Sequence, residues 1–143
     1  MSRAEAPFGE IFIVSDGMGG HRGGGIAAAL TSEILAHELS AIRSLSEASN
    51  AVKAAFEQAN RAVYEKGHCG DEQTRDMGAT AVVLLISCSE ALVAHVWDSR
   101  AYLFVGCKLH RGTKDQNRAQ RMVDAGILTE VQASSHPAAT LLE

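Results

Sequence analysis

The sequence predicts an α+β domain, because helical and strand patterns occupy separate stretches of the chain. An apolar, β-branched strand at 11–14 comes first, and amphipathic helical segments follow at about 24–42 and 44–67. The period then changes to short strands, at about 79–87, 91–98, 101–106 and 108–111. Successive strands joined by tight turns favour antiparallel pairing, which is typical of layered α+β folds.

The composition is that of one ordinary globular domain over residues 1–143. Hydrophobic residues make up 46% and charged residues 21% of the chain, and the formal net charge is −4. Scattered Lys and Arg on an acidic chain argue against a nucleic-acid partner. No apolar run approaches the roughly 20 residues that span a bilayer, so no membrane partner is expected. Three cysteines without a C-x-x-C pair favour the reducing cytoplasm.

The first strand leads into the glycine-rich sequence Asp16-Gly17-Met18-Gly19-Gly20-His21, and residues 1–7 before it are expected to form a loose lead-in. Glycines allow positive φ and close approach of main-chain atoms to a ligand. A carboxylate at a strand end, beside a bare backbone carbonyl, suits a hard cation such as Mg²⁺ or Mn²⁺. The alternative is a strand-to-helix turn in which the acid is incidental.

Capping patterns set the expected helix boundaries. Ser44 and Glu47 fit a capping box at the start of the second helix, and Gly67 is expected to end it. Further along, Asp115 is a candidate cap for a helix that runs through Val123 and stops at Gly126. A second capping box is predicted at Thr129 and Gln132.

Five blocks of sequence, in order, resemble the metal-dependent protein phosphatases of the 2C type, particularly the bacterial ones. The blocks are VSDGMGGH, MGAT, VWDSRAYL, TKDQN and DAGILTE, between Val14 and Glu130. The family has VADGMGGH, MGTT, VGDSRAYL, a T-x-D-H segment and an EAGxIT-like turn. The resemblance covers nearly all of this chain but only about the middle half of a family catalytic domain.

The resemblance implies a partial four-layer αββα sandwich, in which helices flank two antiparallel sheets. It also implies hydrolysis of phosphoserine or phosphothreonine by a water that two divalent ions activate, without a protein nucleophile. The implied metal ligands are Asp16, the carbonyl of Gly17 and, for a weaker third ion, Asp98. A phosphorylated protein would then be the substrate or regulator, in a signalling role.

Other interpretations of these polar residues stay open. His21 and Arg100 are candidates for contacts to phosphate or to the metal-bound water, while His21 also suits a purely structural hydrogen bond. Asp98 and Arg100 could instead pair with each other and fix the end of the strand. Asp115 is explained as well by helix capping as by chemistry.

The chain departs from the family pattern in ways that limit the expected activity. The family's Arg-x-x-Asn-x-Asp segment and its later D-G and D-N blocks have no counterpart, while Trp97 replaces a glycine and Gln116 a histidine. The sequence therefore predicts a metal-dependent phosphatase domain that is truncated and inactive as an isolated chain. The alternative is a non-catalytic phosphatase-like module that binds a phosphoprotein or regulator.

Two structural expectations follow from the resemblance. Asp16 and Asp98 are expected to face one cleft, and open sheet edges are expected to favour homo-oligomers.

Overall fold

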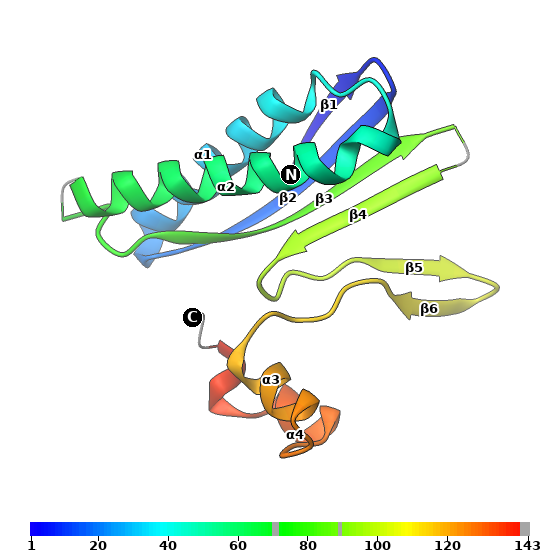
Figure 1. Cartoon of the computed structure of the whole chain (residues 1–143). Helices are drawn as coiled ribbons and strands as arrows, with labels where there is room; N and C mark the ends of the chain where they lie inside the picture. Colours follow the sequence, from blue (N-terminus) through cyan, green and yellow to red (C-terminus); the bar gives the residue numbers. More distant parts are fainter. Residues whose placement is uncertain (70–71, 89, 141–143) are drawn as a thin grey trace. The chain divides into compact units, whose positions relative to one another are not determined.

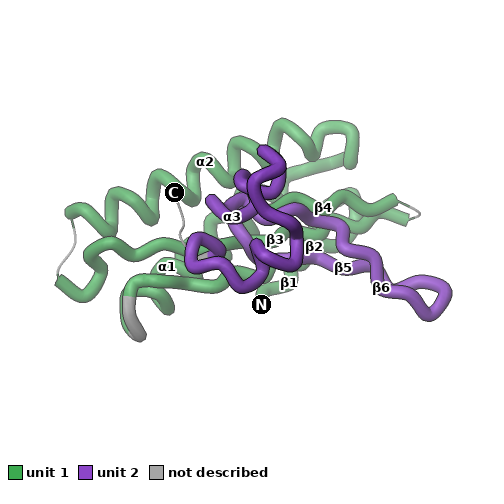
Figure 2. The backbone as a smooth tube through the Cα atoms, turned by 90° about the horizontal axis from the view of Figure 1, so that it is seen from below, with its two compact units in different colours: residues 1–95 green, residues 96–143 purple. Residues whose placement is uncertain are grey.

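The computed structural model describes residues 1–69, 72–88 and 90–140, without the side chains of residues 20, 21 and 140. It divides into two compact units, residues 1–95 and residues 96–143, which Figure 2 shows in green and purple. Each unit has its own hydrophobic cluster. The predicted α+β class is confirmed, and each unit is described below by itself.

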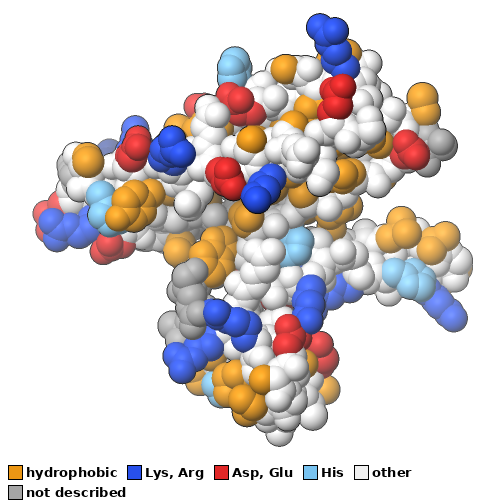
Figure 3. Space-filling model, viewed as in Figure 1, with side chains coloured by type: hydrophobic (Ala, Val, Ile, Leu, Met, Phe, Trp, Pro, Cys, Tyr) orange, Lys and Arg blue, Asp and Glu red, His pale blue; other side chains and the backbone are white. Residues whose placement is uncertain are grey.

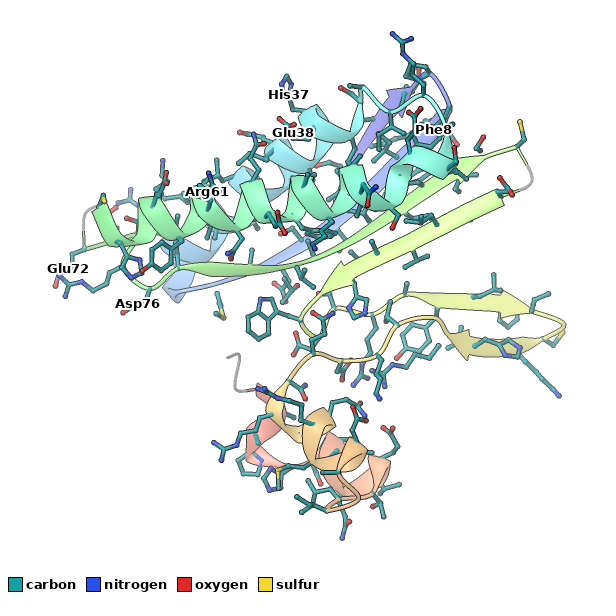
Figure 4. All side chains as sticks on the ribbon, in the orientation of Figure 1. Phe8, His37, Glu38, Arg61, Glu72 and Asp76 are labelled. Atoms are coloured by element: carbon teal, nitrogen blue, oxygen red, sulfur yellow. The ribbon has the colours of Figure 1, made fainter. Side chains whose placement is uncertain are left out.

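A four-stranded sheet with two helices on one face forms the first unit (Figure 1). The strands are adjacent in the order β1 (Ser2–Ala6), β2 (Gly9–Met18), β3 (Gly78–Ser87) and β4 (Glu90–Val96). Helices α1 (Gly20–Leu39) and α2 (Leu45–Cys69) connect β2 to β3 and pack on the sheet and on each other. His37 projects outward from α1 in Figure 4, whereas Glu38 accepts a hydrogen bond from the Gln58 amide of α2 at 3.0 Å.

The core of this unit lies between the helices and one face of the sheet. β2 pairs antiparallel with β3, with Ile11 opposite Leu85 and Ile13 opposite Val83. All four side chains are fully buried, as is Leu35 of α1. Because side chains alternate along a strand, Phe12, Val14 and Asp16 share the other face of β2.

Several boundaries differ from the sequence-based expectations. The first helix, expected at about 24–42, runs from Gly20 to Leu39. The expected loose lead-in instead forms β1, which pairs with β2. Arg3 of β1 forms an ion pair with Glu10, and its guanidinium lies 5.8 Å from the centre of the Phe12 ring in a cation–π contact. β2 continues through Met18 instead of ending before Asp16. α2 does not end at Gly67 but continues to Cys69, and Gly67 is a buried residue of its last turn.

The second unit is a hairpin followed by short helices. β5 (Tyr102–Val105) pairs antiparallel with β6 (Lys108–Arg111), and α3 (Arg118–Asp124), α4 (Glu130–Ser134) and a 3₁₀ helix (Pro137–Thr140) follow. The capping box of Thr129 and Gln132 is confirmed. The cap of α3 is Asn117, whose side-chain oxygen accepts from the Gln120 N–H at 2.9 Å, and not Asp115.

Candidate functional site

Asp16 lies inside β2, two residues before the strand ends. It stands opposite Thr80 of β3, and its side chain is exposed. Among the described residues its carboxylate has no hydrogen-bond or ion-pair partner, whereas the neighbouring Ser15 hydroxyl donates to the Thr80 carbonyl at 2.8 Å. An acid held by a paired strand, with both oxygens free, is available to a cation.

The backbone beside Asp16 packs against the first turns of α1 without any intervening side chain. A Cβ on Gly17 would come within 1.8 Å of the Gly24 carbonyl oxygen. Gly19 ends the turn in a left-handed conformation, with φ 116°, and caps α1 without a side chain. The glycines that the sequence places here therefore serve first to bring β2 and α1 into backbone contact.

Asp98 lies in the loop that follows β4, in the second unit, and is half-buried. Hydrogen bonds tie this loop to the segment before α3: the Gln116 N–H donates to the Trp97 carbonyl at 2.9 Å, and the Ala101 N–H donates to the Thr113 hydroxyl at 3.0 Å. Within the described part of the chain, the Asp98 carboxylate itself has no partner. The backbone thus fixes the position of Asp98 without using its charge.

Arg100 pairs with Asp115 and not with Asp98. Its Nε and Nη2 donate to the two carboxylate oxygens of Asp115 at 2.9 and 2.6 Å, and Arg111 adds a second ion pair. The interpretation that Asp98 and Arg100 fix the strand end by pairing is therefore wrong. The Asp115 side chain is only 8% exposed, and its carboxylate is bound by two arginines. These ion pairs, and not helix capping, account for the position of Asp115.

The electrostatics of this ion-pair cluster favour its charged form. Burial alone raises the pKa of Asp115, but the hydrogen bonds and the charge of Arg100, with those of Arg111, outweigh burial and hold the pKa below its usual value. The hydrogen bond to Asp115 raises the pKa of Arg100 above its usual range. Two of the Arg100 N–H groups, at Nε and Nη2, are therefore held by Asp115.

A cavity of about 460 Å³ lies within the second unit beside this cluster. Both acids, Asp98 and Asp115, line it, together with Arg100, Arg111 and Glu130. Arg100 and Arg111 are bound to Asp115, whereas neither Asp98 nor Glu130 forms an ion pair among the described residues.

The described residues contain no cluster of three His, Cys, Asp or Glu side chains that could hold a metal ion. Asp16 belongs to the first unit and Asp98 to the second, so their expected proximity stays a prediction. The side chain of His21 lies outside the described residues. Asp16 and the Gly17 carbonyl therefore fit part of a metal site, and a complete ligand set would need further groups.

Comparison with known proteins gives consistent results. Residues 4–136 match the protein phosphatase 2C family. The protein phosphatase PhpP of Streptococcus pneumoniae is 36% identical over 129 residues, which are 89% of this chain and 52% of PhpP. The solved serine/threonine phosphatase of S. agalactiae superposes with a TM-score of 0.89 at 32% identity, over 99% of this chain and 59% of that one.

A third relative carries metal. The catalytic domain of the phosphatase PstP, solved in complex with 2 manganese ions, is 29% identical and has a TM-score of 0.72, over 86% of this chain and 53% of that one. The fold is thus that of bacterial serine/threonine phosphatases. This chain belongs to the protein phosphatase 2C family. It spans about half the length of the curated relatives it matches.

Two groups of residues were not expected from the sequence. The first is the ion pair between Arg111 and Asp115. The spacing of four residues between them could have indicated this pair. The second is the pair of hydrogen bonds between Trp97 and Gln116, two positions at which the chain departs from the family pattern. Nothing in the sequence predicted that these two residues are in contact.

Proposed function

We propose that the chain forms part of a metal-dependent phosphoserine/phosphothreonine protein phosphatase domain that uses Mg²⁺ or Mn²⁺. The observation that carries this proposal is Asp16, an exposed and unpaired carboxylate held next to Gly17 by the β2–β3 ladder. Family membership and a manganese-bound relative support it. The substrate would be a phosphorylated protein, as the names of the relatives indicate.

In this proposal, Asp16 and the Gly17 carbonyl hold a divalent ion, and Asp98 contributes to a weaker site. Divalent ions in such sites supply Lewis acidity and activate water for attack on a phosphoryl group. The chain's own part is to present the Asp16 carboxylate on a rigid strand. Arg100 serves to keep the Asp98 loop in place through Asp115.

The proposed domain is incomplete as an isolated chain. Paired divalent ions need several carboxylates, and the described residues supply no cluster of three ligating side chains. A non-catalytic module that binds a phosphoprotein through the same residues is the second candidate. We also propose a cytoplasmic location. Exposed free thiols persist in a reducing compartment, and the chain has three of them, at Cys69, Cys88 and Cys107. None of the described helices is long and apolar enough to cross a membrane.

Mn²⁺ binding tests the proposed ligands. We expect Asp16→Asn to remove most Mn²⁺ binding by the 143-residue chain, because the amide keeps an oxygen but loses the charge. Isothermal titration or Mn²⁺ electron paramagnetic resonance measures this. Glu65→Gln, which removes an exposed acid on α2, is the matched control and should bind like the wild type. Equal loss in both variants would mean diffuse attraction to acidic surface and would reject the site.

We further propose that copies of this chain associate through the hairpin of the second unit. Leu103, Phe104 and Val105 of β5 are 55 to 69% exposed, and Figure 3 shows apolar side chains gathered on this hairpin. A two-stranded hairpin is marginal alone, and its exposed edges favour pairing with another strand. β5 carries no charge, whereas β6 carries Lys108 and Arg111, which would meet like charges across a two-fold axis. We therefore assign the pairing to β5.

Sedimentation velocity over a wide range of protein concentration tests this association. Phe104→Lys should shift the chain toward monomer, because it places a charge at the centre of the pairing strand. Val131→Lys on α4 makes the same change at a side chain that is 81% exposed, and should leave the assembly unchanged. A wild-type chain that stays monomeric throughout would contradict the proposal.

A further inference from the structure

Trp97 adopts a backbone conformation that its side chain disfavours. Its φ is 71°, in the left-handed region where glycine is the usual residue. In L-residues this region brings Cβ close to the following carbonyl oxygen, so a bulky non-glycine residue persists there only when its surroundings hold it. The residue that follows directly is Asp98, so the conformation at Trp97 sets the direction in which Asp98 leaves the strand.

Gln116 holds both backbone polar groups of Trp97. Its side-chain oxygen accepts from the Trp97 N–H at 3.1 Å, and its own backbone N–H donates to the Trp97 carbonyl at 2.9 Å. The chain turns after β4, so the Trp97 N–H has no partner strand to donate to, and the Gln116 side-chain amide accepts from it instead. The two contacts form a closed pair between the loop that carries Asp98 and the segment that precedes α3.

The pair is the first of three successive ties between these segments. Arg100 and Asp115 form the second, and Ala101 forms the third with Gly112 and Thr113. The second and third ties lie after Asp98, and only the Gln116 pair lies before it. Since the Asp98 carboxylate has no partner among the described residues, its direction depends on the backbone on either side.

We propose that Gln116 is a positioning residue, which stabilises the left-handed turn at Trp97 and thereby directs the Asp98 carboxylate into the cavity that it lines. This inference rests on the proposed function only for the use of Asp98 as a metal ligand. The structural part, that Gln116 compensates for the disfavoured conformation of Trp97, stands on the hydrogen bonds and the φ angle.

A double-mutant cycle in urea unfolding tests the structural part. Gln116→Ala should lower the folded-to-unfolded ratio roughly fivefold in the wild type, through the lost hydrogen bond to the Trp97 N–H. Trp97→Gly should be roughly threefold or more stable than Trp97→Ala, the reverse of their usual order, because only glycine adopts φ 71° without strain. In the Trp97→Gly background, Gln116→Ala should cost clearly more, because only Trp97 releases strain when the turn relaxes. Equal costs of Gln116→Ala in both backgrounds would overturn the inference.

A local measurement separates positioning from general stability. Gln116→Ala should move the ¹³Cβ signal of Asp98 in the wild-type background but leave it in place in the Trp97→Gly background. Gln132→Ala, which removes the side-chain amide of the capping box of α4, controls for loss of stability and should not move the Asp98 signal. An Asp98 signal that is unmoved by Gln116→Ala, or moved equally in both backgrounds, would reject the positioning role.

Mn²⁺ titration then tests the link to function. Gln116→Ala should weaken Mn²⁺-induced broadening of the Asp98 amide signal, and Trp97→Gly in the same chain should restore it. If wild-type Asp98 shows no broadening, its proposed use as a metal ligand fails, while the unfolding cycle and the Asp98 ¹³Cβ signal still decide the role of Gln116. The two failures are therefore distinguishable.

Discussion

The isolated 143-residue chain should hydrolyse p-nitrophenyl phosphate or a phosphopeptide, in saturating Mn²⁺, at least about 10³-fold more slowly than the full-length pneumococcal relative PhpP. The physical reason is the ligand set. Asp16 supplies a small part of the negative charge that two divalent ions require, and the described residues contain no group of three ligating side chains.

The measurement is Mn²⁺-dependent release of phosphate by the chain and by its Asp16→Asn variant, with PhpP as the positive control. Residual activity that Asp16→Asn does not change would be ascribed to a contaminating phosphatase. Fast hydrolysis that Asp16→Asn removes would contradict the expectation, and would mean that a second copy or other residues of this chain complete the metal site.

Gly17→Ala should destabilise the first unit by at least about 3 kcal/mol, a large share of the total stability of an ordinary domain. The new methyl group would lie 1.8 Å from the Gly24 carbonyl oxygen, which is backbone and cannot rotate away as a side chain can. β2 and α1 would have to separate, and Asp16 would move with β2. Urea unfolding followed by circular dichroism measures the change.

Gly25→Ala is the matched control, since a Cβ at Gly25 meets nothing within 4 Å. In the interior of α1 this exchange should stabilise the unit by about 0.5–1 kcal/mol, because alanine is the better helix former. The two substitutions should therefore have opposite signs although both lie within one short stretch of sequence. A mild effect of Gly17→Ala would show that β2 and α1 can shift apart without loss of the fold.

Local chemistry explains which elements could be predicted from the sequence. The box of Thr129 and Gln132 depends only on residues three apart, and the structure has both of its hydrogen bonds. The hairpin strands β5 and β6 likewise follow from local pattern and turn residues. Such elements are specified by the segment that forms them.

The missed elements depend on distant partners. Ser2–Ala6 carries no strand pattern of its own and becomes β1 only because β2 offers it a ladder and Arg3 finds Glu10 and Phe12 there. β2 extends past Asp16 because β3 pairs with it as far as Met18. These are tertiary effects that override local propensity.

The candidate site was predictable in part. Sequence blocks indicated the family and singled out Asp16, Gly17 and Asp98, and the structure shows both acids without partners among the described residues. The partner of Arg100 was open, because Asp98 and Asp115 are equally plausible acids on sequence spacing alone. Only the fold of the 97–116 segment, which brings Asp115 to Arg100, decides between them.

The pairing of β2 with β3 has a consequence for the order in which this chain can fold during synthesis. The ladder joins Met18 to Gly78 and Glu10 to Ile86, so its partners are 60 to 76 residues apart (78 − 18 and 86 − 10). Closing a loop of that length costs about 3.6 kcal/mol in chain entropy. Most of the loop is helix, since α1 has 20 residues and α2 has 25. The strand that carries Asp16 is therefore synthesised well before β3, and of the described strands β1 is the partner that precedes it. Its central partner is available only after both helices have been made.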